Sequence, residues 1–259
     1  MAQSVSSQDR WRGFLSEYHR EHAGITEVLL DRSTDPTVGT PYEWMRAAAG
    51  DAPGRVVDLA CGSAPMHRYF SGAISYVGID VSPAELSVAR ERGRGSLVEA
   101  DVCDLPLPDG SAEVITCSMA IMLLDPIERA LSEIARVLKP AGRFICTRPV
   151  TFPIRTRDAR VGASLFRGLR QMPDLPQRFT RNRLKRLMAN VGLRVVDDRA
   201  LRFAHPLHSE DDAARIVEGL YLPTVSPARR NAGVAMLSGL AGPHREVPVS
   251  IRRTVALRP

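Results

Sequence analysis

The sequence lacks any uninterrupted apolar run close to the roughly 18–20 residues that a membrane-spanning helix needs. Its first residues, MAQSVSSQDRWRGF, contain neither the apolar core of a signal peptide nor the acid-poor amphipathic pattern of a transit peptide. We therefore expect a cytoplasmic protein without a membrane partner.

Cysteine is scarce, because the chain of 259 residues has only Cys61, Cys103, Cys117 and Cys146. Their separations match neither the paired spacing of zinc ligands nor a C-x-x-C redox pair. No cluster of histidines, cysteines and carboxylates with ligand spacing is visible elsewhere. We therefore expect reduced thiols and predict that the protein has no metal site.

Lysine is almost absent, since only Lys139 and Lys185 occur among 35 basic residues. Residues 148–259 hold 21 basic and 9 acidic side chains, whereas residues 1–147 hold 14 basic and 20 acidic ones. A basic half is compatible with nucleic acid, an acidic small substrate or a solvated surface. The near-exclusive use of arginine is typical of genome-wide codon bias, so we expect no nucleic-acid partner.

What is present is an alternation of strands and helices between residues 55 and 150. Apolar strand segments are expected at 55–60, 76–80, 96–102, 112–120 and 143–149, and the clearest amphipathic helix at 125–142. This alternation predicts an α/β fold with a doubly wound, mostly parallel sheet.

The flanking segments are less regular. Helical patterns are expected over 1–34, from Pro41 to Gly50, at 180–192, at 209–221 and at 227–240, and two late strands at 193–205 and 247–259. We predict one domain, 1–259, in which 1–54 form a helical lid. Residues 55–150 would form the cofactor-binding half and 151–259 the substrate side, with an insertion at 151–179 and a cap at 205–246.

The strongest site signal is VVDLACGSAP, residues 56–65, in which a strand runs into a turn of small residues. In an open α/β sheet, ligands bind in the crevice beyond the carboxyl ends of the strands. Small residues let backbone N–H groups approach a bound group closely, and the carboxylate of Asp58 suits a cationic ligand group. A tight strand–helix connection with no ligand is the structural alternative.

Two further acids end the next two strands. Asp80 ends YVGID, where an acidic side chain can accept both hydroxyls of a ribose. Asp101, followed by Val102, ends the third strand, where an acid can accept an adenine amino group. The structural alternative for Asp80 is an acid at a helix N-terminus. We expect Asp58, Asp80 and Asp101 to face one crevice.

The helix after Asp80 carries an N-terminal signature. Ser82 is expected as N-cap, Pro83 as the first helical residue, and Glu85 as the partner that completes a capping box with Ser82. The sequence thus predicts a helix that starts directly beside the proposed ribose acid.

On these motifs the chain resembles the class I S-adenosylmethionine-dependent methyltransferases, in particular the group of quinone-biosynthesis and natural-product enzymes. The resemblance covers about residues 55–150, through VVDLACGSAP, GIDVSPAEL, EADVCDLPLPDGSAEVI and LSEIARVLKPAGRFICTRP. It implies a seven-stranded sheet of order 3-2-1-4-5-7-6 with the last strand antiparallel. Ala60 and Ala64 stand where this family usually has glycines.

The resemblance also implies S-adenosyl-L-methionine as cofactor and a set of residues around it. Residues of the turn would line the methionine moiety, acids at the ends of the next two strands would hold ribose and adenine, and the end of the fourth strand would face the substrate. The implied cofactor-binding residues are Asp58, Leu59, Ala60, Cys61, Gly62, Ser63, Asp80, Val81, Asp101, Val102, Cys103, Cys117 and Ser118.

Other functions remain open for the same half of the chain. An NAD(P)-binding dehydrogenase normally has three glycines as G-x-G-x-x-G, and only Gly62 is present in this turn. A cofactor-binding protein that transfers no methyl group is a second rival, because a fold does not fix a function. RNA or protein methylation is a third, but CSMA replaces the Asn-Pro-Pro-Tyr motif that such enzymes often carry. We favour a small-molecule acceptor of specialised metabolism.

The sequence assigns no catalytic residue, and the acceptor atom, O, N or C, is open. A general base would accelerate transfer to a protonated nucleophile by roughly 10²–10⁴-fold, and the candidates are His19, His22 and His205. Candidate substrate-binding residues are Tyr18, His22, Met119 and Arg148. We expect a monomer or a homodimer.

Overall fold

The computed structural model describes residues 7–51, 54–72, 74–171, 175–177 and 179–259. The chain begins with helices α1 (Ser7–Glu21), α2 (Ile25–Asp31) and α3 (Pro41–Arg46). The single helical stretch expected over 1–34 is broken between α1 and α2 by Gly24, which has a left-handed φ of 79° that glycine adopts without steric cost. Helix α3 starts as predicted, with Thr40 and Glu43 forming a capping box.

Seven strands form one sheet in the order β3-β2-β1-β4-β5-β7-β6, which confirms the predicted order. The strands are β1 (Arg55–Leu59), β2 (Ser75–Asp80), β3 (Ser96–Glu99), β4 (Ala112–Cys117), β5 (Leu138–Pro149), β6 (Arg194–Pro206) and β7 (Glu246–Leu257). Strands β1 to β5 pair in parallel, and β7 is antiparallel to both β5 and β6. The carboxyl ends of β1, β2 and β4 therefore meet at one edge.

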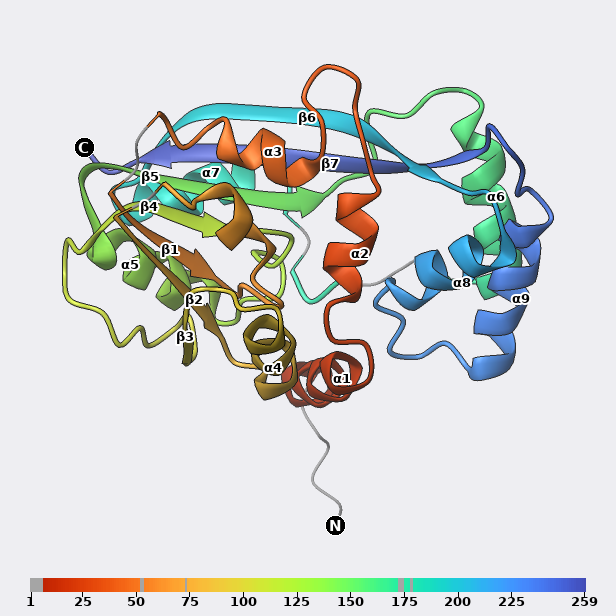
Figure 1. The fold of residues 1–259 in the computed structure, drawn as a ribbon, viewed down its shortest axis with the longest axis horizontal. Helices are drawn as coiled ribbons and strands as arrows, with labels where there is room; N and C mark the ends of the chain where they lie inside the picture. Colours follow the sequence, from red (N-terminus) through yellow and green to blue (C-terminus); the bar gives the residue numbers. More distant parts are fainter. Residues whose placement is uncertain (1–6, 52–53, 73, 172–174, 178) are drawn as a thin grey trace, which may run out of the picture.

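Helices cover both faces of this sheet (Figure 1). On one face, α3, the short 3-10 helix η1 (Pro65–Tyr69) and α4 (Pro83–Glu91) bury apolar side chains against the strands. On the other face, α5 (Ile127–Val137) and α7 (Arg181–Asn190) do the same. The predicted apolar stripe of α5 is buried at Ile127, Leu131 and Ile134, so the amphipathic period of the sequence determined which side faces the sheet.

Strands β6 and β7 continue past the end of β5 and carry a separate helical group. Their pairing runs on to Pro206 and Glu246, whereas β5 pairs with β7 only as far as Pro149. Helices α6 (Asp158–Leu169), α8 (Glu210–Glu218) and α9 (Pro227–Ser238) pack there around their own apolar core. The predicted insertion at 151–179 and the predicted cap thus contribute to one helical group, which we call the cap.

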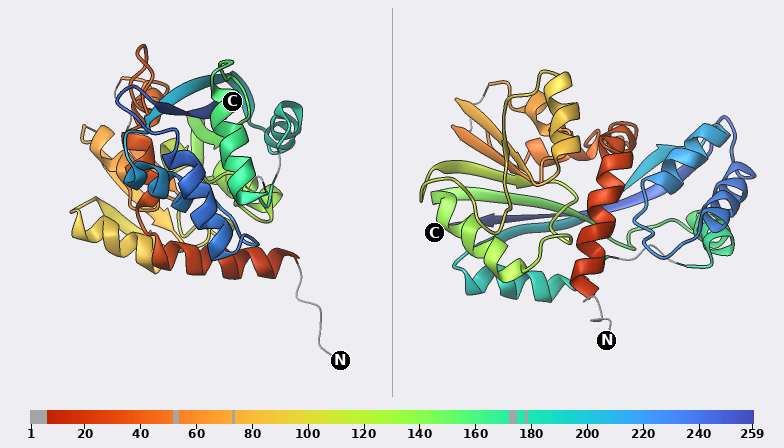
Figure 2. Two further views of the ribbon diagram at one scale, coloured as in Figure 1. Left: turned by 90° about the vertical axis from the view of Figure 1, so that its right-hand side faces the viewer. Right: turned by 90° about the horizontal axis from the view of Figure 1, so that it is seen from below.

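Helix α1 lies between the cap and the sheet half of the molecule (Figure 2). It contacts the cap through the Tyr18 hydroxyl, which donates to the Glu218 carbonyl at 2.8 Å, and through Tyr221, whose ring centroid is 4.9 Å from that of Tyr18. Within the described ranges, no helix is long and apolar enough to cross a membrane. The four cysteines are buried and free.

Candidate active site

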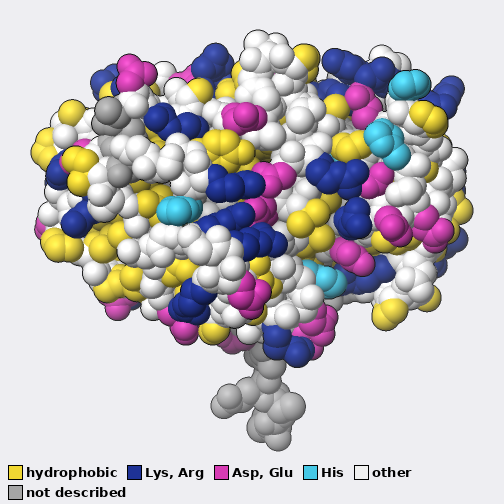
Figure 3. All heavy atoms as spheres, viewed as in Figure 1, with side chains coloured by type: hydrophobic (Ala, Val, Ile, Leu, Met, Phe, Trp, Pro, Cys, Tyr) yellow, Lys and Arg dark blue, Asp and Glu magenta, His cyan; other side chains and the backbone are white. Residues whose placement is uncertain are grey.

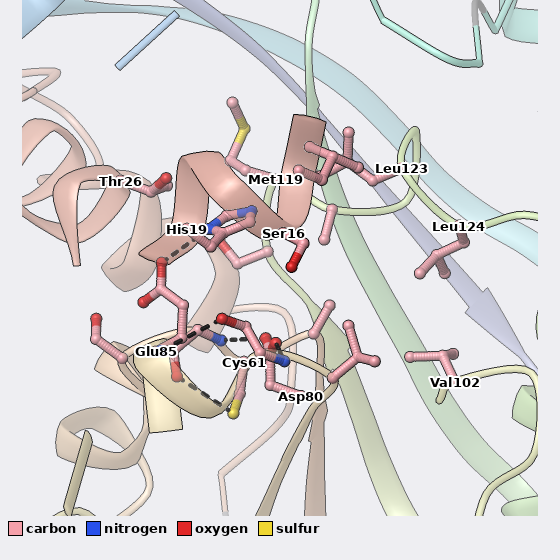
Figure 4. Close-up of a pocket in the computed structure, with 18 of the residues that line it drawn as sticks. Ser16, His19, Thr26, Cys61, Asp80, Glu85, Val102, Met119, Leu123 and Leu124 are labelled. Atoms are coloured by element: carbon pink, nitrogen blue, oxygen red, sulfur yellow. Dashed lines mark hydrogen bonds and ion pairs between the residues drawn. The ribbon is translucent and has the colours of Figure 1, made fainter. Parts of the chain in front are cut away.

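A cavity of about 910 Å³ opens at the carboxyl edge of the sheet, beneath α1 (Figure 4). It is lined by the turn after β1, the ends of β2 and β4, the segment after β3, helix α1 and Tyr221 of the cap. Most of the residues expected around the cofactor lie on its wall: Ala60, Cys61, Gly62, Ser63, Asp80, Val81, Asp101, Val102 and Ser118.

The turn after β1 has a backbone that favours glycine. Gly62 has φ of 54°, and Ala60 and Ala64 also have positive φ, 47° and 54°. An alanine with a positive φ costs on the order of 1 kcal/mol. These two alanines nevertheless adopt the glycine-like conformation that their places in the motif require. The Gly62 N–H donates to Oδ2 of Asp80 at 2.7 Å, which joins the turn to the end of β2.

Asp80 lies at the centre of this wall. Its Oδ1 accepts from the Ser82 N–H at 2.8 Å, and only 7% of the residue is exposed. Burial raises the pKa of Asp80, while its two backbone hydrogen bonds act in the opposite direction. A buried carboxylate that still borders a cavity has lone pairs available for hydroxyl or cationic ligand groups.

The expectation that three acids face one crevice is wrong for Asp58. It lies within β1, and its carboxylate is buried beneath the turn, where it accepts from the Tyr76 hydroxyl at 2.7 Å and the Thr116 hydroxyl at 2.6 Å. Asp58 does not line the cavity. Burial raises the pKa of Asp58 to about 6. Its observed contacts hold β1, β2 and β4 together below the site.

The expectation that Glu85 completes a capping box with Ser82 is also wrong. Ser82 caps α4 as predicted, accepting from the Glu85 N–H, but the Glu85 side chain does not return to close a capping box. It turns toward α1, where Oε1 lies 3.0 Å from Nδ1 of His19 and Oε2 accepts from the Gly24 N–H at 3.0 Å. The Ser82 N–H, which a capping box would have satisfied, is bound by Asp80 instead.

Glu27 is a wall residue that the sequence did not reveal. It is 5% exposed, and its carboxylate accepts from the Ser63 hydroxyl at 2.6 Å, from both terminal nitrogens of Arg94 at 2.6 Å, and from Arg92. Burial raises the pKa of Glu27, but the hydrogen bonds from Arg94 and Ser63 outweigh it, so the net pKa is lowered. Glu27 thereby ties α2 to the turn.

Several predicted residues lie off the cavity wall: Leu59, Cys103, Cys117, Tyr18, His22, His205 and Arg148. His205 is 1% exposed and lies at hydrogen-bond distance from the Ser33 hydroxyl and the Leu29 carbonyl, so its environment is structural. Leu59 and Cys117 are completely buried in the apolar core. Arg148, on β5, is 7% exposed and does not line the cavity.

The part of the wall away from Asp80 is largely apolar. It is formed by Trp11, Leu15, Met119, Ala120, Leu123, Leu124 and Pro176. One polar group here is unsatisfied, because the buried Ser118 hydroxyl has no hydrogen-bond partner within the described part of the chain. Among the residues that the structure describes, no group of three histidines, cysteines or carboxylates could hold a metal ion.

Residues 57–146 match the family model of a methyltransferase domain. A ubiquinone/menaquinone biosynthesis C-methyltransferase from Desulfotalea psychrophila is 37% identical over 121 residues, which cover 42% of this chain and 49% of that protein. The chain thus matches about half the length of this curated relative.

Two solved structures share the fold. A putative methyltransferase from Bacillus halodurans has a TM-score of 0.58 at 17% identity, with 83% of this chain and 96% of that chain covered. The cyclase SpnF has a TM-score of 0.62 at 18% identity, with 98% and 97% covered. At such identities these similarities describe the architecture alone.

Proposed function

We propose that the chain, whose residues 57–146 match a methyltransferase domain, is a class I S-adenosylmethionine-dependent methyltransferase that transfers a methyl group from S-adenosyl-L-methionine to a small-molecule acceptor. The observation that carries the proposal is one cavity in which a buried strand-end carboxylate and a turn with positive φ angles border a largely apolar compartment.

The described residues fit the proposed cofactor. Asp80 would accept the ribose hydroxyls, and the backbone of Ala60 to Ser63 would hold the methionine moiety. Val81 and Val102 would pack on the adenine ring, beside Asp101. All of these groups line the same wall, and the buried carboxylates near it favour a ligand that carries a sulfonium and an ammonium group.

The apolar compartment would hold the acceptor. Its size and composition suit a small organic molecule, since ligand sites of this kind are mostly apolar with a few polar groups that fix orientation. On the face of the molecule that Figure 3 shows, basic and acidic side chains are interspersed, without the continuous basic stripe that nucleic-acid binding favours. The relative named above makes a quinone precursor the first acceptor class to assay.

The chemistry proposed here depends mainly on positioning. A methyl group on a sulfonium is electrophilic when the cofactor is bound, so the protein must hold the acceptor in line with it. Such positioning yields effective molarities of roughly 10⁵–10⁸ M in model reactions. The Ser118 hydroxyl, which directly follows β4 and is buried without a partner among the described residues, would orient a polar group of the acceptor.

Helix α1 and the cap would act as a lid that excludes water. Trp11, Leu15 and Tyr221 reach the cavity from these two elements, and exclusion of water protects a reactive donor. Arg20 is an exposed tryptic site on α1. Trypsin should cleave there more slowly when the cofactor is bound; equal cleavage with and without cofactor would contradict the lid.

Isothermal titration with S-adenosylmethionine tests the cofactor site directly. Asp80→Asn should weaken binding by roughly 1.5–3 kcal/mol for each charge-assisted hydrogen bond lost. Glu99→Gln is the matched control, because Glu99 also ends a strand but is exposed and away from the cavity. Unchanged affinity in Asp80→Asn would refute this site.

Titration with NADH and an assay of methyl transfer separate the rival functions. Binding of NADH in place of S-adenosylmethionine would favour a dehydrogenase. Tight binding of S-adenosylmethionine without methyl transfer to any quinone precursor, phenol, amine, RNA or protein would favour a cofactor-binding protein that transfers no methyl group.

A further inference from the structure

His19 joins α1 to the cofactor half of the molecule. Its Nδ1 lies 3.0 Å from Oε1 of Glu85, whose side chain is only 5% exposed. A carboxylate can only accept hydrogen bonds, so Nδ1 carries the proton in this pair. The second ring nitrogen, Nε2, has no hydrogen-bond partner among the residues that the structure describes.

The imidazole is held in a fixed place. Its centroid lies 5.3 Å from that of Tyr18 and 6.1 Å from that of Tyr221, with both ring pairs edge-on. Glu85 is fixed in turn, because its other oxygen accepts from the Gly24 N–H at 3.0 Å. Two rings and a buried carboxylate therefore orient His19.

The cavity lies on the open side of this arrangement. His19 lines it together with Asp80 and Glu85 (Figure 4), and 20% of the His19 side chain remains exposed. The His19 ring lies close enough to Asp80 that a positive charge on it lowers the pKa of that carboxyl, although burial, the larger effect, raises it. His19 therefore belongs to the end of the cavity where Asp80 lies, away from the apolar compartment formed by Leu123, Leu124 and Pro176.

We infer that His19 is a cofactor-contacting residue, positioned by Glu85, whose Nε2 meets the ribose hydroxyls of the cofactor opposite Asp80. A ribose has two vicinal hydroxyls, so one can donate to Asp80 while the other forms a hydrogen bond with Nε2. Helix α1 thus supplies part of the ribose site itself, and docking of α1 is coupled to cofactor binding. This inference rests on the proposed function.

Two other roles for His19 differ from this one in measurable ways. A general base would act on the acceptor, which places its effect on turnover and leaves cofactor affinity unchanged. A purely structural link between α1 and α4 would need only Nδ1. The inferred contact needs Nε2 and changes the affinity for any ligand that contains the ribose.

Two substitutions separate the ring nitrogens. His19→Asn keeps a donor near the position of Nδ1 and removes Nε2, whereas His19→Gln places an amide near the position of Nε2. Binding is measured by calorimetry with S-adenosylmethionine and with 5′-methylthioadenosine, which retains the ribose and adenine but lacks the amino-acid portion. His22→Ala is the matched control, because His22 follows on the same segment but does not line the cavity.

We expect His19→Asn to weaken binding of both ligands by about tenfold, the loss of one modest hydrogen bond, and His19→Gln to remain within about threefold of the wild type. His22→Ala should bind as the wild type does. Thermal unfolding without ligand shows whether each variant is folded, and Glu85→Gln should weaken both ligands by a smaller factor.

Wild-type affinity of His19→Asn for both ligands would overturn the inference, as would a loss confined to S-adenosylmethionine, which would place the contact on the amino-acid portion. Failure of the wild-type protein to bind either ligand would instead overturn the proposed function and the inference with it. A His19→Gln variant as weak as His19→Asn would show that an amide near the position of Nε2 does not restore binding, and would also refute the contact.

Discussion

Glu27 gives the sharpest test of how the turn is supported. Its carboxylate lies between Ser63 of the turn and Arg94 beyond α4, and both Glu27 and Arg94 are less than 9% exposed. Glu27→Ala would leave the Arg94 guanidinium buried, with the Ser63 carbonyl, 2.7 Å away, as its one remaining partner among the residues described. Removing one partner of a buried ion pair typically costs about 3–5 kcal/mol, because the remaining charge is left uncompensated.

The other two cations near Glu27 add little to this figure. The side chains of Arg68 and Arg92 are 41% and 36% exposed, so solvent screens their interaction with Glu27 and compensates for its loss. For a chain of this size, about 3–5 kcal/mol corresponds to a fall in Tm of roughly 6–20 °C. Differential scanning calorimetry or urea unfolding measures it.

Glu17→Ala is the matched control. Glu17 pairs with Arg20 at 3.2 Å, but their side chains are 68% and 67% exposed, and such a pair is worth about 0–1 kcal/mol. If Glu27→Ala were no more destabilising than Glu17→Ala, the proposed energetics of the buried pair would be wrong. The double variant Glu27→Met, Arg94→Met should lose less than the sum of the single variants, because it leaves no unpaired charge.

Three further outcomes follow from particular contacts. Because Asp58 has a folded pKa of about 6 against about 3.9 unfolded, its contribution to stability is present below about pH 4 and is lost as the pH rises to about 6. The free energy of unfolding of the wild type, minus that of Asp58→Asn, should therefore fall by about 3 kcal/mol over that pH range when both are measured by urea unfolding. A difference that does not change with pH would contradict the assigned burial. A Cβ at Gly168 would lie 2.6 Å from Cα of Gly233, so Gly168→Ala should separate α6 from α9 at a cost of about 1–3 kcal/mol, with faster hydrogen exchange in the cap than in the sheet. Methyl transfer should survive EDTA unchanged; loss of activity that Mg²⁺ restores would refute a metal-independent reaction.

Local patterns predicted much of the sheet half of the molecule. Ser82 caps its helix as expected, and Thr40 and Thr180 cap theirs in the same way, because an N-cap hydroxyl binds a backbone N–H only three residues away. The turn was placed correctly because strand, small residues and helix follow one another directly in the chain. The order of the strands came from the family resemblance, and local pattern alone would not have given it.

The orientation of Asp58 could not be predicted in the same way. A strand residue points to one face or the other, and what it meets there depends on its neighbours across the sheet. Its partners are Tyr76, on β2, and Thr116, which lies 58 residues away on β4. With apolar side chains at these two positions, the same local motif would have been compatible with a carboxylate that faced the cavity.

The sequence contains a weak indication of the close contact between α6 and α9. Glycine inside a helix costs about 1 kcal/mol relative to alanine, so Gly168 and Gly233 in two helical patterns indicate that something approaches closely. In the structure they meet each other. The sequence does not say which glycine faces which, and so the insertion at 151–179 and the predicted cap appeared to be separate.

The least predictable part of the site is the side that would receive the acceptor, and the reason is geometric. Its wall combines Trp11 and Leu15 of α1, Leu123 and Leu124 after β4, and Pro176 before α7. These segments are far apart in the chain, and each contributes one or two apolar side chains with no motif of their own. Asp80 and the turn, in contrast, come from neighbouring parallel strands whose ends must meet. The cofactor half can therefore be recognised from sequence, whereas the acceptor must be identified by binding and turnover.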